Sequence, residues 1–207
     1  MLTLAIETAT AACSVALFDG PDLIAERHEI VGRGHAERLV PAIGELIAEA
    51  GRRPGAILVD CGPGSFTGVR VGLAAARGLG LAWGVPVAGF SALALLAVEA
   101  GDVATVAVAI PGGHGELFVQ RFACRPLAPL TDLASLLPAD AAVAMVDDRV
   151  IGPAAPALVA ARGAGEALDR WPRAADARLL PEALRTLPPS PIYGRAPDAK
   201  LPGGVAA

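Results

Sequence analysis

The spacing of apolar residues in the first part of the chain predicts short strands joined by tight turns. Residues 2–8, 13–19 and 23–31 carry the apolar and β-branched side chains that strands favour, and Asp19-Gly20-Pro21-Asp22 is a typical hairpin turn. Strands that follow one another with such short links pair most simply as an antiparallel meander. We therefore expect the chain to open with three antiparallel strands.

A helical period replaces the strand pattern after this meander. Leu39, Ile43 and Leu46 recur at helical spacing, which predicts a helix from about residue 34 to residue 50 that ends at Gly51. The elements expected next are a strand at 56–60, a helix at 67–83, a strand at 85–89 and a helix at 90–100. This order favours an α/β lobe of the RNase H type, in which right-handed helical crossovers add parallel strands to a meander.

The second half of the chain begins like a smaller copy of the first. Residues 103–110 and 116–123 predict another hairpin, whereas the Ala-, Pro- and Arg-rich sequence after residue 125 has weak periodicity. The elements expected there are a strand at 141–146, a terminal helix at 176–187 and an irregular tail from Pro188. The sequence thus predicts an α/β fold with two lobes, each a mixed β-sheet flanked by helices, and a reduced second lobe. The boundaries expected are 1–100 for the first lobe, 101–190 for the second and 191–207 for the tail.

Composition narrows the classes of protein that this chain can represent. Of its 207 residues, 54% are hydrophobic and 18% are charged, which favours a packed globule over a disordered chain. The net charge is −4 without a block of basic residues, so we expect any contact with RNA to be made through a partner. No apolar run approaches the roughly 20 residues that span a bilayer, and the start of the chain lacks the basic leader of a signal peptide. We expect a cytoplasmic protein that does not bind membranes.

A glycine-rich segment, residues 62–72, separates a predicted strand from the helix that follows. Gly62 and Gly64 allow backbone angles that a Cβ atom would forbid, and Ser65 or Thr67 can cap the helix. A helix N-terminus beside glycine backbone can bind an anion, although the segment matches neither the Walker A loop nor the dinucleotide fingerprint. The residues that could form an anion or nucleotide site are Glu7, Thr8, Gly62, Gly64, Ser65, Thr67 and Gly68.

The helix after this segment is rich in small residues. Gly68, Gly72, Gly78 and Gly80 lie in it beside several alanines, and each glycine costs about 1 kcal/mol relative to alanine within a helix. Close packing must offset that cost. One interpretation is tight packing on the chain's own sheet, and another is that one face of the helix receives a helix of a partner subunit. The two interpretations are compatible because a helix has two sides.

Several of these segments together resemble the bacterial TsaB (YeaZ) family of the actin-like and RNase H-like superfamily. They are Ala5-Ile-Glu-Thr-Ala-Thr10, Cys13-Ser-Val-Ala-Leu17, His35 at the start of the first helix, residues 62–72, and Pro191-Ile-Tyr193 with Arg195. The resemblance implies an actin-like ATPase fold. It also implies a part in making threonylcarbamoyladenosine at position 37 of tRNAs that read codons beginning with A.

In that family the TsaB-like chain is the partner of a catalytic TsaD-like subunit, which it contacts through its first two helices, and a TsaE-like ATPase joins them. tRNA would be bound only through the complex. Carried over to this sequence, the resemblance implies the partner-binding residues His35, Leu39, Ile43, Val69, Arg70, Leu73 and Arg77. An exposed apolar helix face also predicts a homodimer through the same helices when the partner is missing.

Candidate catalytic residues favour a partner subunit over an enzyme. The family usually has Asp where this chain has Glu7, and Asp-Ala-Arg where it has Pro111-Gly112-Gly113, so nucleotide hydrolysis is not expected. His28, His35 and His114 do not form the His pair, four residues apart on a helix, of a metal site or a metallopeptidase. We assign no catalytic or metal-binding residue and expect no required cofactor, with ATP or ADP at a subunit interface left open. The alternative function is an independent actin-like ATPase or small-molecule kinase.

Overall fold

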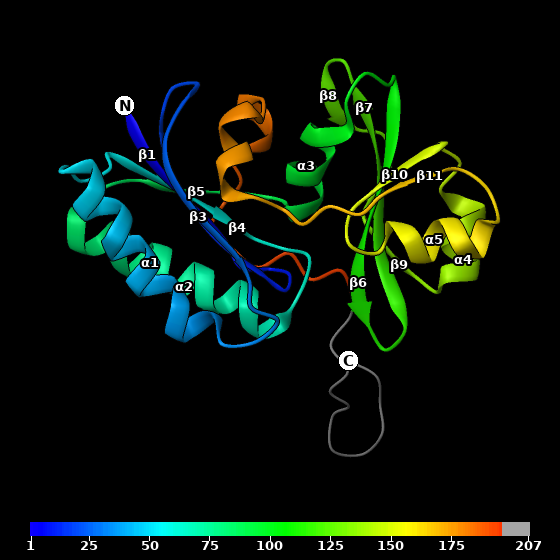
Figure 1. The fold of residues 1–207 in the computed structure, drawn as a ribbon, viewed down its shortest axis with the longest axis horizontal. Coiled ribbons are helices and arrows are strands. Elements are labelled where there is room, and N and C mark those ends of the chain that lie inside the picture. The colour runs from blue at the N-terminus through cyan, green and yellow to red at the C-terminus, as the bar shows by residue number, and fades with distance from the viewer. Residues whose placement is uncertain (196–207) are drawn as a thin grey trace.

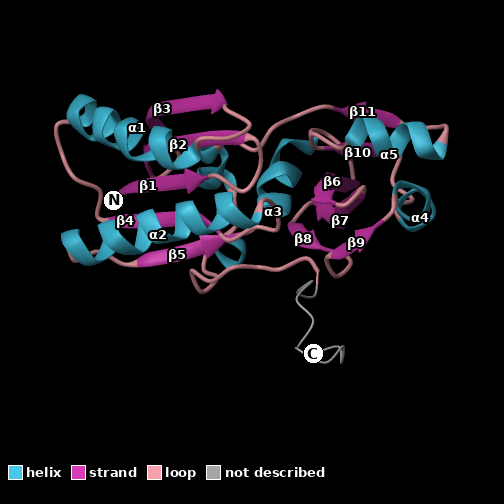
Figure 2. Cartoon of the chain, turned by 90° about the horizontal axis from the view of Figure 1, so that it is seen from below, coloured by secondary structure: helices cyan, strands magenta, loops and turns pink. Residues whose placement is uncertain are grey.

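The chain folds into two lobes that lie side by side (Figure 1). The structure, a computed structural model, describes residues 1–195. Within these residues, no helix combines the length and the apolar character that a membrane span requires. Each lobe contains a mixed β-sheet, and helices cover the sheets (Figure 2). This arrangement confirms the predicted α/β fold with two lobes.

The first lobe contains a five-stranded sheet with the strand order β3-β2-β1-β4-β5. In it, β1 pairs antiparallel with β2 and parallel with β4. The elements are β1 (Leu2–Glu7), β2 (Ala12–Asp19), β3 (Asp22–Ile30), α1 (His35–Ala50), β4 (Ala56–Asp60), α2 (Phe66–Trp83) and β5 (Val87–Phe90). The meander and the crossover helices lie where the apolar pattern predicts them, because every strand and helix here has its own buried face.

Helices α1 and α2 lie side by side over one face of this sheet (Figures 1 and 2). α1 covers β2 and β3, and its side chains Leu39, Ile43 and Leu46 are buried. α2 covers β1, β4 and β5, and buries Val69 and Leu73. The apolar period that predicts the two helices is therefore used for packing on the chain's own sheet.

The second lobe repeats this topology, although four of its strands are shorter than any strand of the first lobe. Its sheet has the order β11-β10-β6-β7-β8, and β6 pairs antiparallel with β7 and parallel with β10, as β1 does with β2 and β4. The elements are β6 (Thr105–Gly113), β7 (Glu116–Cys124), β8 (Leu127–Pro129), β9 (Ala134–Leu136), α4 (Pro138–Ala144), β10 (Arg149–Ile151), α5 (Ala155–Arg162) and β11 (Glu166–Leu168). Four of these strands have only 3 residues, which agrees with a reduced second lobe.

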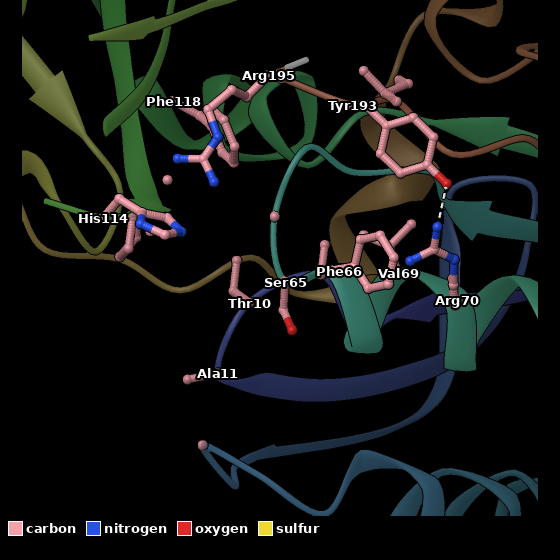
Figure 3. A pocket seen from close by; sticks show the side chains of 18 of the residues that line it. Thr10, Ala11, Ser65, Phe66, Val69, Arg70, His114, Phe118, Tyr193 and Arg195 are labelled. Carbon is pink, nitrogen blue, oxygen red and sulfur yellow. Dashed lines mark hydrogen bonds between the residues drawn. The ribbon is translucent and has the colours of Figure 1, made fainter. Parts of the chain in front are cut away.

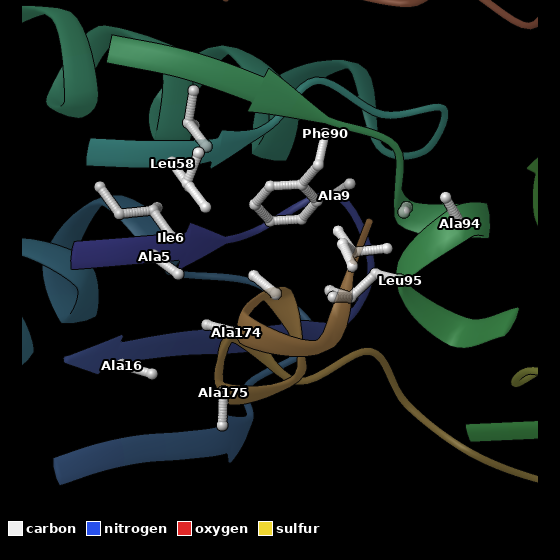
Figure 4. Close-up of a cluster of buried hydrophobic side chains, with 14 of the residues drawn as sticks. Ala5, Ile6, Ala9, Ala16, Leu58, Phe90, Ala94, Leu95, Ala174 and Ala175 are labelled. Carbon is white, nitrogen blue, oxygen red and sulfur yellow. The ribbon is translucent and has the colours of Figure 1, made fainter. Parts of the chain in front are cut away.

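Two elements pack on the sheet of the lobe to which they do not belong by sequence. The helix α3 (Ala92–Ala97) and the short 3₁₀ helix η1 (Val98–Ala100) follow β5, yet α3 packs on β6 and β7. The 3₁₀ helix η2 (Ala174–Leu179) follows β11, yet it packs on β1, β2 and β3. Figure 4 shows its Ala174 and Ala175 against the first sheet, and the Ala174 N–H donates to Ser14 Oγ at 3.0 Å. The two lobes consequently share one hydrophobic core.

Two elements predicted for the second half of the chain are wrong. Residues 141–146, predicted as a strand, lie largely in α4, which begins with Pro138 at a position where the missing N–H is not needed. The predicted terminal helix at 176–187 is replaced by η2 and a further 3₁₀ helix, η3 (Glu182–Leu184). Pro181 separates them, because it can neither donate a helical hydrogen bond nor accommodate the preceding turn.

Residues 174–192 run back along the first lobe. Gly89 N–H donates to Leu187 O at 2.7 Å, and Ile192 N–H donates to Cys61 O at 2.7 Å. By these contacts, the last part of the range 101–190 belongs with the first lobe. The predicted tail is described only as far as Arg195, where it has neither helix nor strand, and its remainder lies outside the described residues.

Candidate functional site

The hairpin turns of the two sheets face each other across a cleft where the lobes meet. Residues 9–11, between β1 and β2, and residues 111–114, at the end of β6, both line it. The start of α2 and residues 192–195 complete the lining (Figure 3). The cleft has a volume of about 830 Å³, which falls within the roughly 300–1,000 Å³ of small-molecule sites.

The glycine-rich segment forms the wall of this cleft on the side of the first lobe. Ser65 caps α2, because its side chain accepts a hydrogen bond from Gly68 N–H at 3.2 Å. Ser65 N–H in turn donates to Ala9 O at 2.6 Å, which ties the segment to the end of β1. A Cβ atom on Gly64 would overlap that same carbonyl group, so only glycine permits so close an approach.

Most of the predicted anion-binding residues are used inside the fold. Thr8 Oγ1 donates to Gly68 O at 2.8 Å, and a Cβ atom on Gly68 would overlap the Thr8 carbonyl oxygen. Gly62 N–H donates to Asp60 Oδ1 at 2.7 Å. Thr67 is exposed on α2 and does not line the cleft. Of the predicted set, only Gly64 and Ser65 line the cleft. Gly62 instead packs against Ile192 and Val69, and Gly68 packs against Thr8.

Glu7 and Asp60 form a buried pair of carboxyl groups beneath the glycine-rich segment. Both are almost fully buried, and Glu7 Oε1 accepts from Ala9 N–H at 2.9 Å. Burial, and then the charge of Asp60, raise the pKa of Glu7 well above its usual value, and burial raises the pKa of Asp60 to about 7. The remaining oxygens, Glu7 Oε2 and Asp60 Oδ2, have no other partner, so a proton shared between them satisfies both.

The magnesium nucleotide of an actin-like ATPase does not fit this arrangement. A magnesium ion needs accessible carboxylate oxygens, whereas Glu7 and Asp60 lie below the segment and do not line the cleft. Among residues 1–195, no cluster of three or more His, Cys, Asp or Glu side chains could hold a metal ion.

An arginine between two aromatic rings stands at the mouth of the cleft. Arg70 Nη2 donates to the Tyr193 hydroxyl oxygen at 2.6 Å, and the guanidinium carbon of Arg70 lies 3.1 Å from the centre of the Phe66 ring. Phe66 and Tyr193 remain 66% and 57% exposed, so the cluster presents its rings to the cleft and to solvent. The sequence does not identify Phe66 as a site residue, because nothing in the helix pattern shows that it faces residues 192–195.

His114 of the second lobe and Arg195 of the C-terminal segment lie on the opposite wall (Figure 3). His114 is a non-glycine residue with a positive φ of 52°, a conformation in which histidine is enriched. Arg195 Nη1 lies 3.6 Å from Glu116 Oε2, and Glu116 also accepts from Ser135 Oγ at 2.6 Å. The sequence signal for this wall was the hairpin turn around His114, but it does not reveal that the turn faces the first lobe.

The predicted partner-binding residues divide into a buried group and an exposed group. Five of them face the chain's own core, because each is less than 9% exposed: His35, Leu39, Ile43, Val69 and Leu73. His35 Nε2 lies 3.0 Å from Ala12 O, with which it shares a hydrogen bond. These five side chains pack mainly within the chain, and their contact with a partner stays a prediction. Arg70 and Arg77 are exposed, and Arg77 Nε donates to Pro189 O at 3.1 Å.

Other residues form the outer face of the helix pair. On α1, Val40 is 61% exposed, and on α2, Leu81 is 87% exposed. Gly44 and Gly78 are exposed, and an added Cβ atom would meet nothing within 4 Å at either position. Unlike Gly68, these two glycines are therefore not explained by packing within the chain. We call these residues, together with exposed Ala74, the outer face of α1 and α2.

Comparison with known sequences places these features among proteins of tRNA modification. The chain matches the family model of TsaD, tRNA N6-adenosine threonylcarbamoyltransferase, over residues 27–125. It is 34% identical to an uncharacterized protein of Mycobacterium tuberculosis over 95% of this chain and 93% of that protein. It is 37% identical to the tRNA threonylcarbamoyladenosine biosynthesis protein TsaB of Escherichia coli, over 59% of this chain but only 55% of that protein.

Solved structures extend the likeness to the whole fold. A Pseudomonas aeruginosa protein described as similar to peptidase YeaZ superposes with a TM-score of 0.78 at 31% identity, over 94% of this chain and 99% of that one. YeaZ from the same organism gives a TM-score of 0.72 at 31% identity, over 84% and 87% of the two chains. Because the likeness covers most of both chains and includes both lobes, this chain belongs to the TsaB (YeaZ) family.

Proposed function

We propose that this chain is a non-catalytic subunit of the complex that makes N6-threonylcarbamoyladenosine at position 37 of tRNAs reading codons that begin with A. In this proposal it binds and activates a TsaD-like catalytic subunit in the cytoplasm, a TsaE-like ATPase joins them, and tRNA is bound only through the complex. The names of the E. coli and other TsaB relatives support the pathway. The closed Glu7–Asp60 pair supports the absence of catalysis by this chain.

The observation that carries the partner role is the outer face of α1 and α2. A glycine inside a helix costs about 1 kcal/mol relative to alanine, and Gly44 and Gly78 gain no close contact within the chain in return. Glycines that let two helix backbones approach closely would recover that cost in a complex. The exposed Val40 and Leu81 supply apolar area for the same contact.

A matched pair of substitutions tests this surface. Ala74→Phe adds a ring to the exposed side of α2, and Ala160→Phe adds the same ring to the exposed side of α5, the corresponding helix of the second lobe. We expect Ala74→Phe to weaken binding to a co-expressed TsaD-like subunit by at least about tenfold, which is about 1.4 kcal/mol. Ala160→Phe should bind like the wild type. Equal binding by both variants in calorimetric titration would remove α2 from the interface.

The same face serves self-association in this proposal when the partner is absent. Light scattering of the isolated chain should then report a homodimer that Ala74→Phe dissociates and Ala160→Phe does not. A monomer at high concentration would contradict self-association without affecting the test with the catalytic subunit.

The second candidate function, an independent actin-like ATPase or small-molecule kinase, is tested separately. The purified chain with magnesium and ATP should show no turnover above that of Glu7→Gln, because the carboxyl pair is closed off from the cleft. Steady hydrolysis that Glu7→Gln abolishes would favour the ATPase.

A further inference from the structure

Two stretches of chain cross between the lobes, and they touch each other at the junction. The first contains α3 and η1, and the second leads through residues 169–173 into η2. η1 packs on β10 of the second lobe, η2 packs on β1, β2 and β3 of the first lobe, and η1 and η2 are themselves in contact. The contact between η1 and η2 therefore links the two lobes beyond the covalent connections.

Two carboxyl groups, from Glu99 of η1 and Asp176 of η2, meet in this contact. Their side chains lie within hydrogen-bonding reach of each other. Asp176 Oδ2 is buried and has no other partner among the described residues, and a buried oxygen without a hydrogen bond is costly. Two ionised carboxylates cannot form that hydrogen bond, whereas a carboxylic acid can donate to a carboxylate. One proton on Glu99 therefore completes the contact.

The arginines closest to Asp176 are engaged elsewhere and do not replace this proton. Arg173 Nη2 donates to Glu26 Oε2 of β3 at 2.5 Å. Arg178 Nη1 donates to Ala175 O at 2.6 Å, and it lies 3.6 Å from Asp176 Oδ1, which leaves Oδ2 without a cation.

The other charged groups around the pair also leave it without a direct cation. Arg170 lowers the pKa of Glu99, but by less than burial and the neighbouring carboxyl group raise it. His28 of β3 is kept neutral, because burial and a nearby arginine lower its pKa. On the side of β10, Arg149 pairs with Glu166 at 2.7 Å. The proton between the two carboxyl groups is therefore the feature that holds η1 to η2.

We propose that the Glu99–Asp176 pair is a pH-sensitive latch between the two connections that join the lobes. With one proton shared, the pair holds η1 against η2. With both groups ionised, their like charges repel and η2 separates from η1.

The latch would work near neutral pH. Burial, and then the hydrogen bond and charge of Asp176, raise the pKa of Glu99 from 4.5 to about 7. A raised pKa in the closed state means that the latch is fully closed below about pH 4.5 and loosens as the pH rises through about 7. The inference is independent of the proposed role of the outer face of α1 and α2, because neither residue lies on those helices.

Amide hydrogen exchange at η2, corrected for the intrinsic effect of pH on exchange, measures the opening. Ala174 N–H donates to Ser14 Oγ at 3.0 Å, so it is protected while η2 is in place. The pKa change from 4.5 to about 7 corresponds to an opening equilibrium about tenfold larger at pH 8 than at pH 6. Glu99→Gln should remove this difference, because the amide can donate to Asp176 at every pH.

Two control variants make the test specific. Glu182→Gln removes an exposed carboxylate of η3 and should keep the difference at Ala174. Glu7→Gln alters the other buried carboxyl pair, which stays intact when only η2 opens, so it should also keep the difference. Ile57 N–H, which donates to Pro86 O at 3.0 Å in the first sheet, reports global unfolding and should exchange more slowly than Ala174.

Asp176→Asn is a second variant, and it should flatten the pH response in the same way, because its amide can donate to ionised Glu99. The proposal is overturned if exchange at Ala174 does not change with pH in the wild type, or if it is as slow as at Ile57, since opening is then global. It is also overturned if Glu99→Gln keeps the difference or if Glu7→Gln removes it.

Discussion

The two lobes place different chemistry at matching ends of their parallel strands. In the first lobe Glu7 and Asp60 follow the last paired residues of β1 and β4, whereas in the second lobe Ala109 and Gly152 follow those of β6 and β10. Each lobe nevertheless ties the loop after its second parallel strand to the end of its first strand. Ser65 N–H donates to Ala9 O at 2.6 Å, beyond Glu7, and Ala154 N–H donates to Ala109 O at 3.1 Å, at the position that matches Glu7. The carboxyl pair is therefore not required to close the loop.

Glycine provides this closure in both lobes. A Cβ atom on Gly64 would overlap Ala9 O, and a Cβ atom on Gly152 would overlap Ala109 O. The lobes thus agree in the backbone contact and differ in the acids beneath it. In both lobes the fold depends on a glycine backbone that approaches a strand-end carbonyl group closely. In the first lobe, Glu7 and Asp60 also make the stability of the fold depend on pH.

The buried carboxyl groups of the two lobes also titrate in opposite directions. Burial alone would raise the pKa of Asp147 in the second lobe, but hydrogen bonds from Arg121 and Thr105 and the charge of Arg121 together hold the pKa below its usual value. Glu7 and Asp60 have no cation as partner, and their pKa values are raised. Substitutions in both lobes test these contrasts, from the largest expected effect to the smallest.

Arg121→Met should have the largest effect, because it leaves Asp147 buried without a cation. Arg121 Nε and Nη2 donate to the two oxygens of Asp147 at 2.6 and 3.1 Å, and the Asp147 side chain is 1% exposed. Removing one partner of such a pair lowers the free energy of unfolding by about 3 kcal/mol. Urea unfolding measures it. Arg27→Met breaks exposed ion pairs to Glu45 and Glu49, so it should cost less than about 1 kcal/mol.

Gly64→Ala and Gly152→Ala should each lower the free energy of unfolding by about 2 kcal/mol, because a backbone carbonyl group must move to admit the new Cβ atom. Equal losses would support equivalent closure in the two lobes. A neutral result at one position would break the comparison there. Gly44→Ala is the control, and it should stabilise the free chain by up to about 1 kcal/mol since its surroundings are open.

Glu7→Gln should have the smallest effect, and it appears as a change in pH dependence. A raised pKa in the folded state means that folding favours the protonated pair, so stability is full below about pH 4 and is lost as the pH rises through about 7. Glutamine can still accept from Ala9 N–H and donate to Asp60. The free energy of unfolding should therefore change less between pH 4 and 8 in this variant than in the wild type. Urea unfolding across this range measures it.

Asp147→Asn provides the matched comparison in the second lobe. The pKa of Asp147 is lowered, so its contribution is present above its ordinary value near 4 and is lost as the pH falls. In this variant the free energy of unfolding should fall less steeply as the pH is lowered below about 4. Above pH 6, its dependence on pH should be the same as in the wild type. The same change of slope in both variants would contradict the assignment of opposite shifts to the two lobes.

The first lobe was predictable because its elements are long enough for their periods to be distinct. The second lobe was less so, since residues 141–146 form an apolar run too short to separate strand from helix by period. The run forms α4 because alanine has a high helix propensity and because Pro138 is favourable at the first position of a helix. In the range 176–187, Pro181 prevents the single helix that the apolar spacing suggested.

The candidate site was predictable only in part, for a physical reason. The spacing of Leu39, Ile43 and Leu73 shows that one face of each helix is apolar, but not whether a sheet or a partner covers it. The glycines of residues 62–72 pointed correctly to close packing, whereas the anion site suggested for Glu7 and Thr8 is filled by the chain itself. The pairing of Arg70 with Tyr193 joins residues 123 positions apart, which no local pattern encodes.

The exchange of α3 and η2 between the lobes has a practical consequence for dissecting the protein. A fragment that stops before residue 174 would leave Ala5, Ile6 and Ala16 without the cover that Ala174 and Ala175 provide. A fragment that starts at residue 101 would lack α3 against β6 and β7. Neither half is thus a self-sufficient unit for recombinant expression, and any binding assay on this protein requires the uninterrupted polypeptide.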